Sequence, residues 1–341
     1  MDRIPALDGV RAIAIAAVLI GHSLYAINLL GWAILTGYAG VSIFFVLSGF
    51  LVTRVMLLDE IRAGRLRLGR FYRRRALRIF PGFYVFLAAL YILGRLGLAG
   101  PQSNDTWIAS LLYLRNFFGT GWDTGHLWSL ALEEQFYFVW PSVFLLLGTR
   151  RRRLIFVAAA VLASTILRAC WLDQFPSTIP ADAIPPLLCW PQMRMDTFLI
   201  GAAFAIGNFE WAGVLQPIFI FPFLAFWFET ALFSRWTLPI YTPLIAFTIG
   251  AMILWLIKNP QLRANHNLSR PGIVYIGVIS YSLYLWQQVF LGPHLRWWSL
   301  PAVAVCALGS YYLIERPFLR WKDPLDCNQR AFSGLPANAS D

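Results

Sequence analysis

Residues 38–58 read YAGVSIFFVLSGFLVTRVMLL, an apolar run in which Arg54 is the only charged residue. At about 1.5 Å of rise per residue, a helix of this length crosses the roughly 30 Å of hydrocarbon in a bilayer. The small residues Gly40, Ser48 and Gly49 would let a neighbouring helix approach closely. This stretch therefore predicts a transmembrane helix that packs against others.

The composition of the whole chain agrees with this prediction. Hydrophobic residues make up 58% of the 341 residues and charged residues only 13%, whereas ordinary globular proteins have about 25% charged residues. A soluble fold of this size has too little interior to bury that much apolar surface. The composition excludes a soluble enzyme, a disordered chain and a typical nucleic-acid-binding protein, and it indicates an integral membrane protein.

Further apolar runs are long enough to span a membrane, and ten can be counted in all. They are residues 7–28, 38–58, 79–98, 126–147, 154–173, 191–208, 212–229, 237–257, 272–292 and 299–314. We therefore expect an all-α, polytopic membrane helix bundle of about ten transmembrane helices. The transmembrane domain is expected to cover residues 1–322, followed by a polar cytoplasmic tail over 323–341.

The distribution of arginine predicts the orientation of these spans. The net charge is +11, and the basic residues gather in segments 54–78, 150–153 and 258–271 and in the tail. Ten spans place all these segments on the same side as the N-terminus. Because basic loops are retained in the cytoplasm, both termini are expected there.

The first predicted span carries two ionisable residues, which are costly inside a membrane and often functional. The spacing of Arg11 and His22 brings them to nearly the same helix face, about 16 Å apart in depth. Arg11 would lie near the cytoplasmic boundary, where Asp8 could pair with it, and His22 in the outer half of the membrane. Arg11 could also be an interfacial anchor, and His22 a structural histidine bonded to a neighbouring helix.

An arginine cluster, RFYRRRALR over residues 70–78, leads into the third predicted span. Arg75 and Arg78 fall on one helical face, with Arg74 beside them. A guanidinium binds phosphate through a bidentate fork and stays charged when partly buried. These arginines are candidates for binding a phosphorylated ligand, and Ser48 could line a passage for a thin ligand chain. Contact with anionic lipid is the alternative.

The fourth predicted span opens with HLWSLALEEQFY over residues 126–137. Ser129 could cap this helix, with Glu133 near its positive end. Adjacent carboxylates at the outer end of a span are unusual, so Glu133 or Glu134 is expected to face a cavity; capping and an interfacial position are the alternative. His126 is expected to be interfacial.

Other polar residues give weaker signals. Tyr281 and Tyr284 lie on a polar stripe of the ninth span, for which hydrogen bonding between helices is the default expectation. Cys170 and Cys189 both fall on the predicted outer side, where a disulfide could form. The chain has no CxxC pair, and no metal site is expected.

These segments, in this order, resemble the acyltransferase-3 family of multi-spanning membrane proteins. The matching segments are Leu7–Arg11 with His22, Phe44–Phe50, Arg75–Pro81, Trp128–Tyr137, Ile279–Trp286 and Glu315–Pro317. The resemblance covers roughly residues 3–322. Many members have a histidine where this chain has Gln287, and some carry a further extracytoplasmic esterase-like domain, which we do not expect here.

In that family an acyl group passes from cytoplasmic acyl-coenzyme A to a hydroxyl of a carbohydrate or other acceptor. The resemblance implies that Arg11 and His22 match the essential pair of the first span, and that Arg75 and Arg78 match an arginine pair that would bind the acyl donor. Further candidates are donor-binding Arg74 and Ser48, catalytic Glu133 and Glu134, and Trp128, Ser129, Tyr137, Tyr281 and Tyr284 as acceptor or structural support.

We therefore expect a membrane O-acyltransferase of a bacterial cytoplasmic membrane, of the type that O-acetylates polysaccharide or lipopolysaccharide. An acyl group, acetyl foremost, would pass from acyl-coenzyme A to a cell-surface glycan or lipid-linked sugar, with His22 as base or transient acyl acceptor. Acyl-coenzyme A would be a co-substrate; no tightly bound cofactor, metal or nucleic acid is expected. The alternative is a proton-coupled transporter in which His22 and Glu133 or Glu134 form a relay.

Overall fold

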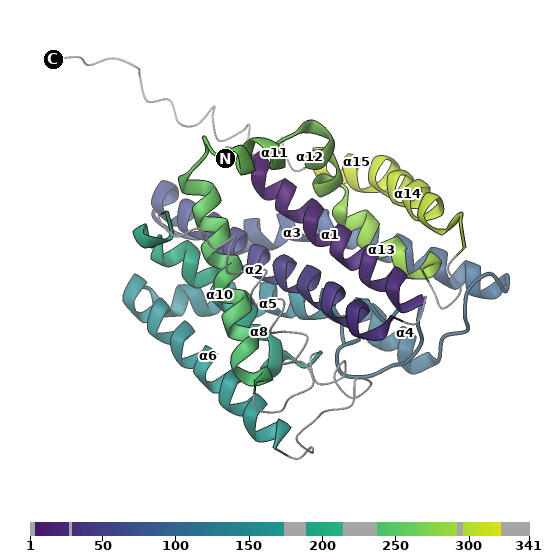
Figure 1. Cartoon of the computed structure of the whole chain (residues 1–341), viewed down its shortest axis with the longest axis horizontal. Coiled ribbons are helices and arrows are strands. Elements are labelled where there is room, and N and C mark those ends of the chain that lie inside the picture. The colour runs from purple at the N-terminus through teal and green to yellow at the C-terminus, as the bar shows by residue number, and fades with distance from the viewer. Residues whose placement is uncertain (1–3, 27–28, 174–188, 214–236, 292–295, 322–341) are drawn as a thin grey trace.

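The computed structural model describes residues 4–26, 29–173, 189–213, 237–291 and 296–321, and these form helices and turns without a strand. The helices are α1 (Pro5–Ala26), α2 (Leu30–Ala63), α3 (Leu68–Arg95), α4 (Asn104–Leu111), α5 (Leu127–Leu147), α6 (Arg150–Leu172), α8 (Pro191–Gly207), α10 (Leu238–Lys258), α11 (Arg263–Leu268), α12 (Pro271–Val278), α13 (Ser280–Phe290), α14 (Ser299–Ser310) and α15 (Arg316–Arg320), with a 3-10 turn at Glu210–Gly213 and a π turn, η3, at Tyr311–Glu315. Figure 1 shows α1 across the front of the bundle, with α13 and α14 on one side and α10 and α6 on the other.

The all-α membrane bundle is confirmed. Seven of the described helices are long and apolar enough to cross a membrane, and α12 with α13 would make an eighth span, bent by 67°. α8 matches the predicted span 191–208, and most of the predicted span 212–229 lies outside the described residues. The total of ten spans and the orientation of the termini therefore stay predictions, and the tail over 323–341 also lies outside the described residues.

The loop that was expected over residues 54–78 is much shorter than predicted. α2 continues to Ala63 and α3 begins at Leu68, so only residues 64–67 connect them. Leucine and arginine are good helix formers, and the helices run on beyond the apolar runs. Gly64, at a φ of 67°, ends α2 in the left-handed conformation that glycine adopts without strain. Arg75 and Arg78 lie on α3, which confirms that they are on one helix.

An aromatic stack joins α2, α5 and α8 at the centre of the bundle. The ring of Phe198 lies 4.2 Å from that of Phe45 on α2 and 4.8 Å from that of Phe136 on α5, both nearly parallel. All three side chains are buried. These contacts hold the interior helices in register, and α2 presents its opposite side to α1.

α6 is held to the bundle by ion pairs near its two ends. Only 17% of its apolar stretch is buried, so most of it is available to lipid. Arg153 donates to both carboxylate oxygens of Glu60 at 2.9 Å, and Arg168 lies 2.5 Å from Asp196 on α8. Lipid tails are as apolar as the helix surface, so polar contacts of this kind supply specific attachment.

Candidate functional site

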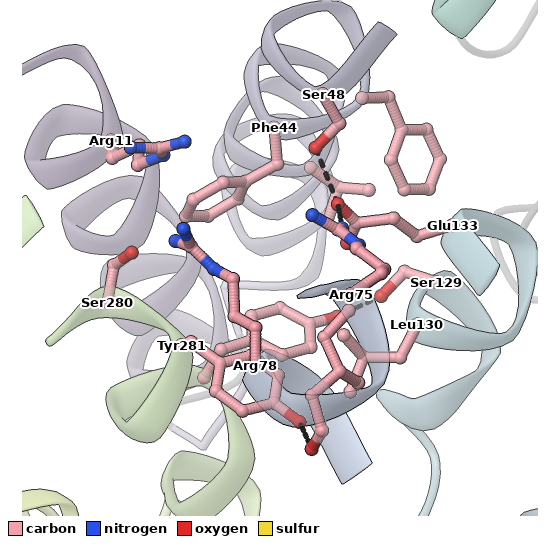
Figure 2. Close-up of a pocket in the computed structure, with 14 residues that line it drawn as sticks. Arg11, Phe44, Ser48, Arg75, Arg78, Ser129, Leu130, Glu133, Ser280 and Tyr281 are labelled. Carbon is pink, nitrogen blue, oxygen red and sulfur yellow. Dashed lines mark hydrogen bonds and ion pairs between the residues drawn. The ribbon is translucent and has the colours of Figure 1, made fainter. Parts of the chain in front are cut away.

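Five helices that are far apart in the sequence surround one cavity of about 80 Å³, which has room for several water molecules. Figure 2 shows its charged and polar side chains converging from these helices. The lining residues are Arg11 of α1; Val41, Phe44, Phe45 and Ser48 of α2; Arg75, Arg78 and Ile79 of α3; Ser129, Leu130 and Glu133 of α5; and Ser280, Tyr281 and Tyr284 of α13. The cavity is therefore a product of tertiary packing.

Glu133 is the centre of the polar network in this cavity. Its Oε1 accepts hydrogen bonds from Ser48 Oγ at 2.5 Å, from Arg75 Nη2 at 3.1 Å and from the Tyr137 hydroxyl. Glu134 lies farther away, with its Oε1 3.9 Å from Arg75 Nε. Three donors on one oxygen suit a carboxylate that serves as counter-ion to Arg75.

The contact between Glu133 and Arg75 joins two helices that the sequence did not connect. α5 begins at Leu127, so Glu133 lies almost two turns inside the helix. Arg75 likewise lies about two turns inside α3, and its guanidinium packs 3.4 Å above the ring of Tyr137. Both charges are in the interior, where an ion pair is far less costly than two separate charges.

The three arginines of the cavity differ in their partners. Arg11 Nη1 donates to Asp8 Oδ1 at 2.7 Å, which confirms the predicted pair, and Arg75 bonds to Glu133. Arg78 makes no hydrogen bond or ion pair with any residue in the described part of the chain, although it lines the cavity. Figure 2 shows its guanidinium beneath Phe44, between those of Arg11 and Arg75. Arg78 is therefore the arginine of the cavity that has no direct contact with a carboxylate in the described part of the chain.

Ser129 and Tyr284 form a second network at the cavity wall. The Ser129 hydroxyl and the Tyr284 hydroxyl each donate to the carbonyl oxygen of His126 at 3.0 Å, and the two hydroxyls also contact each other. Ser129 is therefore not the helix cap that the sequence predicted, because the chain is already helical there and His126 holds the cap position.

The other aromatic candidates support the structure around the cavity. The Tyr281 hydroxyl donates to the carbonyl of Ile79 at 2.8 Å, and the Trp128 ring packs edge-on against Phe45 at 6.0 Å. Trp128 and Arg74 are outside the cavity lining. Glu315 on η3 accepts a hydrogen bond from Ser282 of α13, at 2.5 Å.

His22 lies apart from the cavity, farther along α1. Its Nδ1 is 3.0 Å from the carbonyl oxygen of Val18, and its ring meets the ring of Trp122 edge-on at 5.9 Å. Trp122 also stacks on Tyr25 at 4.8 Å, and its Nε1 donates to the carbonyl of Gln288 at 2.9 Å. The structure thus places Arg11 and His22 at two levels of one helix and shows no contact between His22 and Glu133.

No sequence pattern predicts the contact of Trp122 with His22 or the residue that holds Trp122 in place. Arg115 donates to the carbonyls of residues 118–121 and to Thr124, so it ties together the turn that carries Trp122. Burial lowers the pKa of Arg115, but its many acceptors compensate the charge. No short motif predicts such a contact; a lone arginine in a glycine-rich outer loop was the only signal.

Two further residues of this region can be placed. The His126 side chain, at the start of α5, is buried with 2% of its surface exposed because α13 packs against it. Cys170 and Cys189 form no disulfide with each other, and burial raises the pKa of Cys189 to about 12. In the described part of the chain no group of three or more histidine, cysteine, aspartate or glutamate side chains could hold a metal ion.

A sequence model of acyltransferase domains matches residues 4–316, nearly the whole chain. The chain belongs to the acyltransferase-3 family. Five of the six segments that carried the resemblance contribute residues to the cavity. These residues are Arg11; Phe44, Phe45 and Ser48; Arg75 and Arg78; Ser129 and Glu133; and Ser280, Tyr281 and Tyr284. The family motifs, scattered along the sequence, therefore describe one site.

Similar members of the acyltransferase-3 family include named O-acetyltransferases. The peptidoglycan O-acetyltransferase OatA of Listeria monocytogenes is 28% identical over 83% of this chain and 49% of its own length. A putative peptidoglycan O-acetyltransferase of Bacillus subtilis is 27% identical over 92% of this chain and 54% of its own length. A putative O-acetyltransferase of Staphylococcus aureus is 28% identical over 93% of this chain and 58% of its own length. The chain spans about half the length of these relatives. No solved structure matches it.

Proposed function

We propose that this chain is a membrane O-acyltransferase that moves an acyl group, acetyl foremost, from acyl-coenzyme A to a hydroxyl of a carbohydrate. The observation that carries the proposal is Arg78, an arginine that lines the cavity and makes no hydrogen bond or ion pair in the described part of the chain. Arg11 and Arg75 beside it form ion pairs with carboxylates. A guanidinium whose hydrogen bonds are available in a cavity wall suits a phosphorylated donor.

The cavity has two further features that suit such a donor. α13 begins at Ser280, which lines the cavity, so the positive end of this helix lies at the same place as Arg78. The wall also carries the rings of Phe44, Phe45 and Tyr284, which offer apolar surface to a pantetheine arm. The phosphates would bind at Arg78, and the pantetheine arm would pass Phe44 and Tyr284 toward His22.

His22 is suited to act as the base. The Val18 carbonyl can only accept a hydrogen bond, so His22 Nδ1 carries the hydrogen and Nε2 keeps its lone pair. Nε2 takes the proton of the acceptor hydroxyl, the hydroxyl oxygen attacks the thioester carbon, and the C–S bond breaks. The proton then passes from His22 to the coenzyme A thiolate, so the reaction is balanced. A transient acyl-histidine is the alternative route.

The acceptor proposed here is a carbohydrate outside the cytoplasmic membrane of a bacterium. Relatives named as peptidoglycan O-acetyltransferases support this class of acceptor. A donor from the cytoplasm and an acceptor from the other side would meet near His22, which lies toward the end of α1 remote from Arg11. Arg11 and Arg75, each held by a carboxylate, would shape the donor site.

Radiolabelled acetyl-coenzyme A and chitopentaose, a soluble oligosaccharide of N-acetylglucosamine, test the proposal with the purified protein in nanodiscs. The wild type should transfer label to the oligosaccharide, and Arg78→Ala should raise the donor KM roughly 10- to 100-fold, the worth of a lost charge-assisted hydrogen bond. Arg73→Ala is the matched control, since Arg73 is exposed on the same helix. A folded wild type that transfers no label, or equal effects of the two substitutions, would contradict the proposal.

A further inference from the structure

His126, at the start of α5, is a buried histidine that the proposed chemistry does not use. Its ring meets those of Phe86 at 5.8 Å and Tyr284 at 5.4 Å, both edge-on. Its backbone N–H donates to Gln288 Oε1 at 2.7 Å. The imidazole is therefore held from several sides and has one defined orientation.

The hydrogen bonds of His126 determine which ring nitrogen carries the proton. Nε2 lies 3.1 Å from the carbonyl oxygen of Leu285, which can only accept, so Nε2 bears the hydrogen. Nδ1 is then a lone-pair acceptor. It is buried and has no hydrogen-bond partner in the described part of the chain. An unpaired acceptor in the interior costs free energy, and in native proteins it commonly marks the place of a water or a ligand.

His126 is a neighbour of the proposed base. Trp122, one turn earlier in the chain, packs edge-on against His22, and its Nε1 bonds to the same Gln288 that holds the His126 backbone. Two histidines with free lone pairs, His22 Nε2 and His126 Nδ1, therefore lie in one region of the bundle.

His126 is also joined to the cavity. Ser129 and Tyr284, which both line it, donate to the His126 carbonyl oxygen. The ring of Tyr284 contacts the imidazole directly. The residue thus links the wall of the donor cavity with the place where His22 would meet the acceptor.

We propose that His126 Nδ1 binds the carbohydrate acceptor by accepting a hydrogen bond from a hydroxyl or amide N–H next to the hydroxyl that His22 deprotonates. This inference rests on the proposed function. Amino sugars carry such donors on adjacent ring carbons, so two neighbouring imidazole lone pairs suit them. His126 takes no proton in this role; it is a binding residue that orients the acceptor.

The protonation state of His126 agrees with this role. The ring is buried among the rings of Phe86 and Tyr284, where a charged imidazolium would be poorly solvated. The imidazole therefore stays neutral at every pH near neutrality and remains an acceptor at Nδ1, whereas an imidazolium would present a donor there.

Two substitutions separate this role from a purely structural one. In His126→Gln the side-chain amide reaches the position of Nε2 and can still donate to Leu285, but no acceptor remains at Nδ1. In His126→Asn the shorter amide places its oxygen where Nδ1 was, but it is too short to donate a hydrogen bond to the carbonyl of Leu285. With acetyl-coenzyme A and chitopentaose, His126→Gln should raise the acceptor KM about 10-fold with an unchanged donor KM. Its thermal midpoint should fall, because the ring contacts with Phe86 and Tyr284 are lost. His126→Asn should lower the thermal midpoint but keep an acceptor KM nearer to that of the wild type.

A set of acceptor analogues tests the same contact without relying on the folding of a variant. Monodeoxy and N-methylated chitooligosaccharides each remove one donor, and one of them should raise the acceptor KM of the wild type. That analogue should cause no further loss in His126→Gln, as expected when both changes remove the same hydrogen bond. The inference would be overturned, and the proposed function left standing, if His126→Gln kept the acceptor KM of the wild type or if no analogue changed the acceptor KM of an active wild type. If the wild type transferred no acetyl group to any acceptor, the proposed function would be overturned instead.

Discussion

Three arginines of the same type take different parts in one cavity because their partners differ. Asp8 forms an ion pair with Arg11 and Glu133 forms one with Arg75, whereas Arg78 makes no ion pair in the described part of the chain. A paired guanidinium inside a membrane protein stabilises the structure around it. A guanidinium without an ion pair keeps its hydrogen bonds available for a bound anion. For this reason the phosphates of the proposed donor are assigned to Arg78.

Glu133→Gln should destabilise the protein as well as abolish transfer. The substitution leaves the Arg75 charge without its counter-ion and weakens the contacts to Ser48 and Tyr137. Breaking a fully buried pair costs about 3–5 kcal/mol, and since both side chains here are about one-fifth exposed we expect roughly 2–4 kcal/mol. Thermal unfolding in nanodiscs measures the loss.

Glu134→Gln is the control for this prediction. It removes the same charge one residue away, where the carboxylate lies 3.9 Å from Arg75 Nε instead of bonding to it. We expect a smaller change in the unfolding midpoint. A larger loss for Glu134→Gln than for Glu133→Gln would show that Glu134 is the true counter-ion of Arg75.

At the level of helices, α2 and α8 touch through their backbones. A Cβ added to Gly201 would lie 2.1 Å from the carbonyl oxygen of Val46, and one added to Gly49 would lie 2.0 Å from that of Phe198. Each helix thus presents a glycine to a carbonyl of the other, as in other closely packed membrane helices. This contact places Phe45 and Ser48, on the same part of α2, at the cavity.

Gly201→Ala should push α8 away from α2 and disturb the cavity wall. The methyl group cannot fit against a backbone oxygen, so we expect a lower unfolding midpoint and a loss of transfer of at least about 10-fold; overpacking of this kind typically costs 1–3 kcal/mol. Gly309→Ala on α14 is the matched control, because nothing lies within 4 Å of the added carbon. There we expect unchanged or slightly higher stability. Equal effects at the two glycines would contradict the contact.

The bend between α12 and α13 also shapes the cavity. The apolar run 272–292 predicts one straight span, but the helix breaks at Ile279 and turns by 67°. The break brings the first turn of α13, with Ser280 and Tyr281, to the cavity. Hydropathy reports only the length of an apolar run, so it carries no information about this bend.

For the whole molecule, the positive-inside distribution leads to a prediction about sidedness. The exposed residues Arg65, between α2 and α3, and Arg152, at the start of α6, should lie in the cytoplasm, and the exposed Asn104 of α4 on the other side. Single cysteines at these positions, in a variant without the native cysteines, can be labelled with an impermeant maleimide in intact cells and in inverted vesicles.

Asn104→Cys should react in intact cells, and Arg65→Cys and Arg152→Cys only in inverted vesicles. This pattern would support cytoplasmic donor entry, since Arg11 and the arginine-rich start of α3 would share the cytoplasmic side. Labelling of all three positions from the same side would contradict both the span count and the orientation.

The predictable part of this molecule follows local rules. The bilayer thickness sets the length of an apolar run, and helical spacing places Arg11 near Asp8 and Arg75 near Arg78. Family membership followed from motifs in a fixed order, and the match over residues 4–316 confirmed it. The prediction of a cap at Ser129 failed because it depended on where the helix begins, and α5 is already helical there.

The amino-acid sequence by itself determined that this protein is an all-α membrane bundle of the acyltransferase-3 family, and it identified most residues of the cavity. Only the tertiary structure decided their partners. It joined Glu133 to Arg75 and Ser48, left Arg78 free, set His22 against Trp122 and buried His126 with an open lone pair. The reason is physical: hydropathy and periodicity act along one helix, whereas ion pairs and hydrogen bonds form between helices whose contacts depend on packing across the whole bundle.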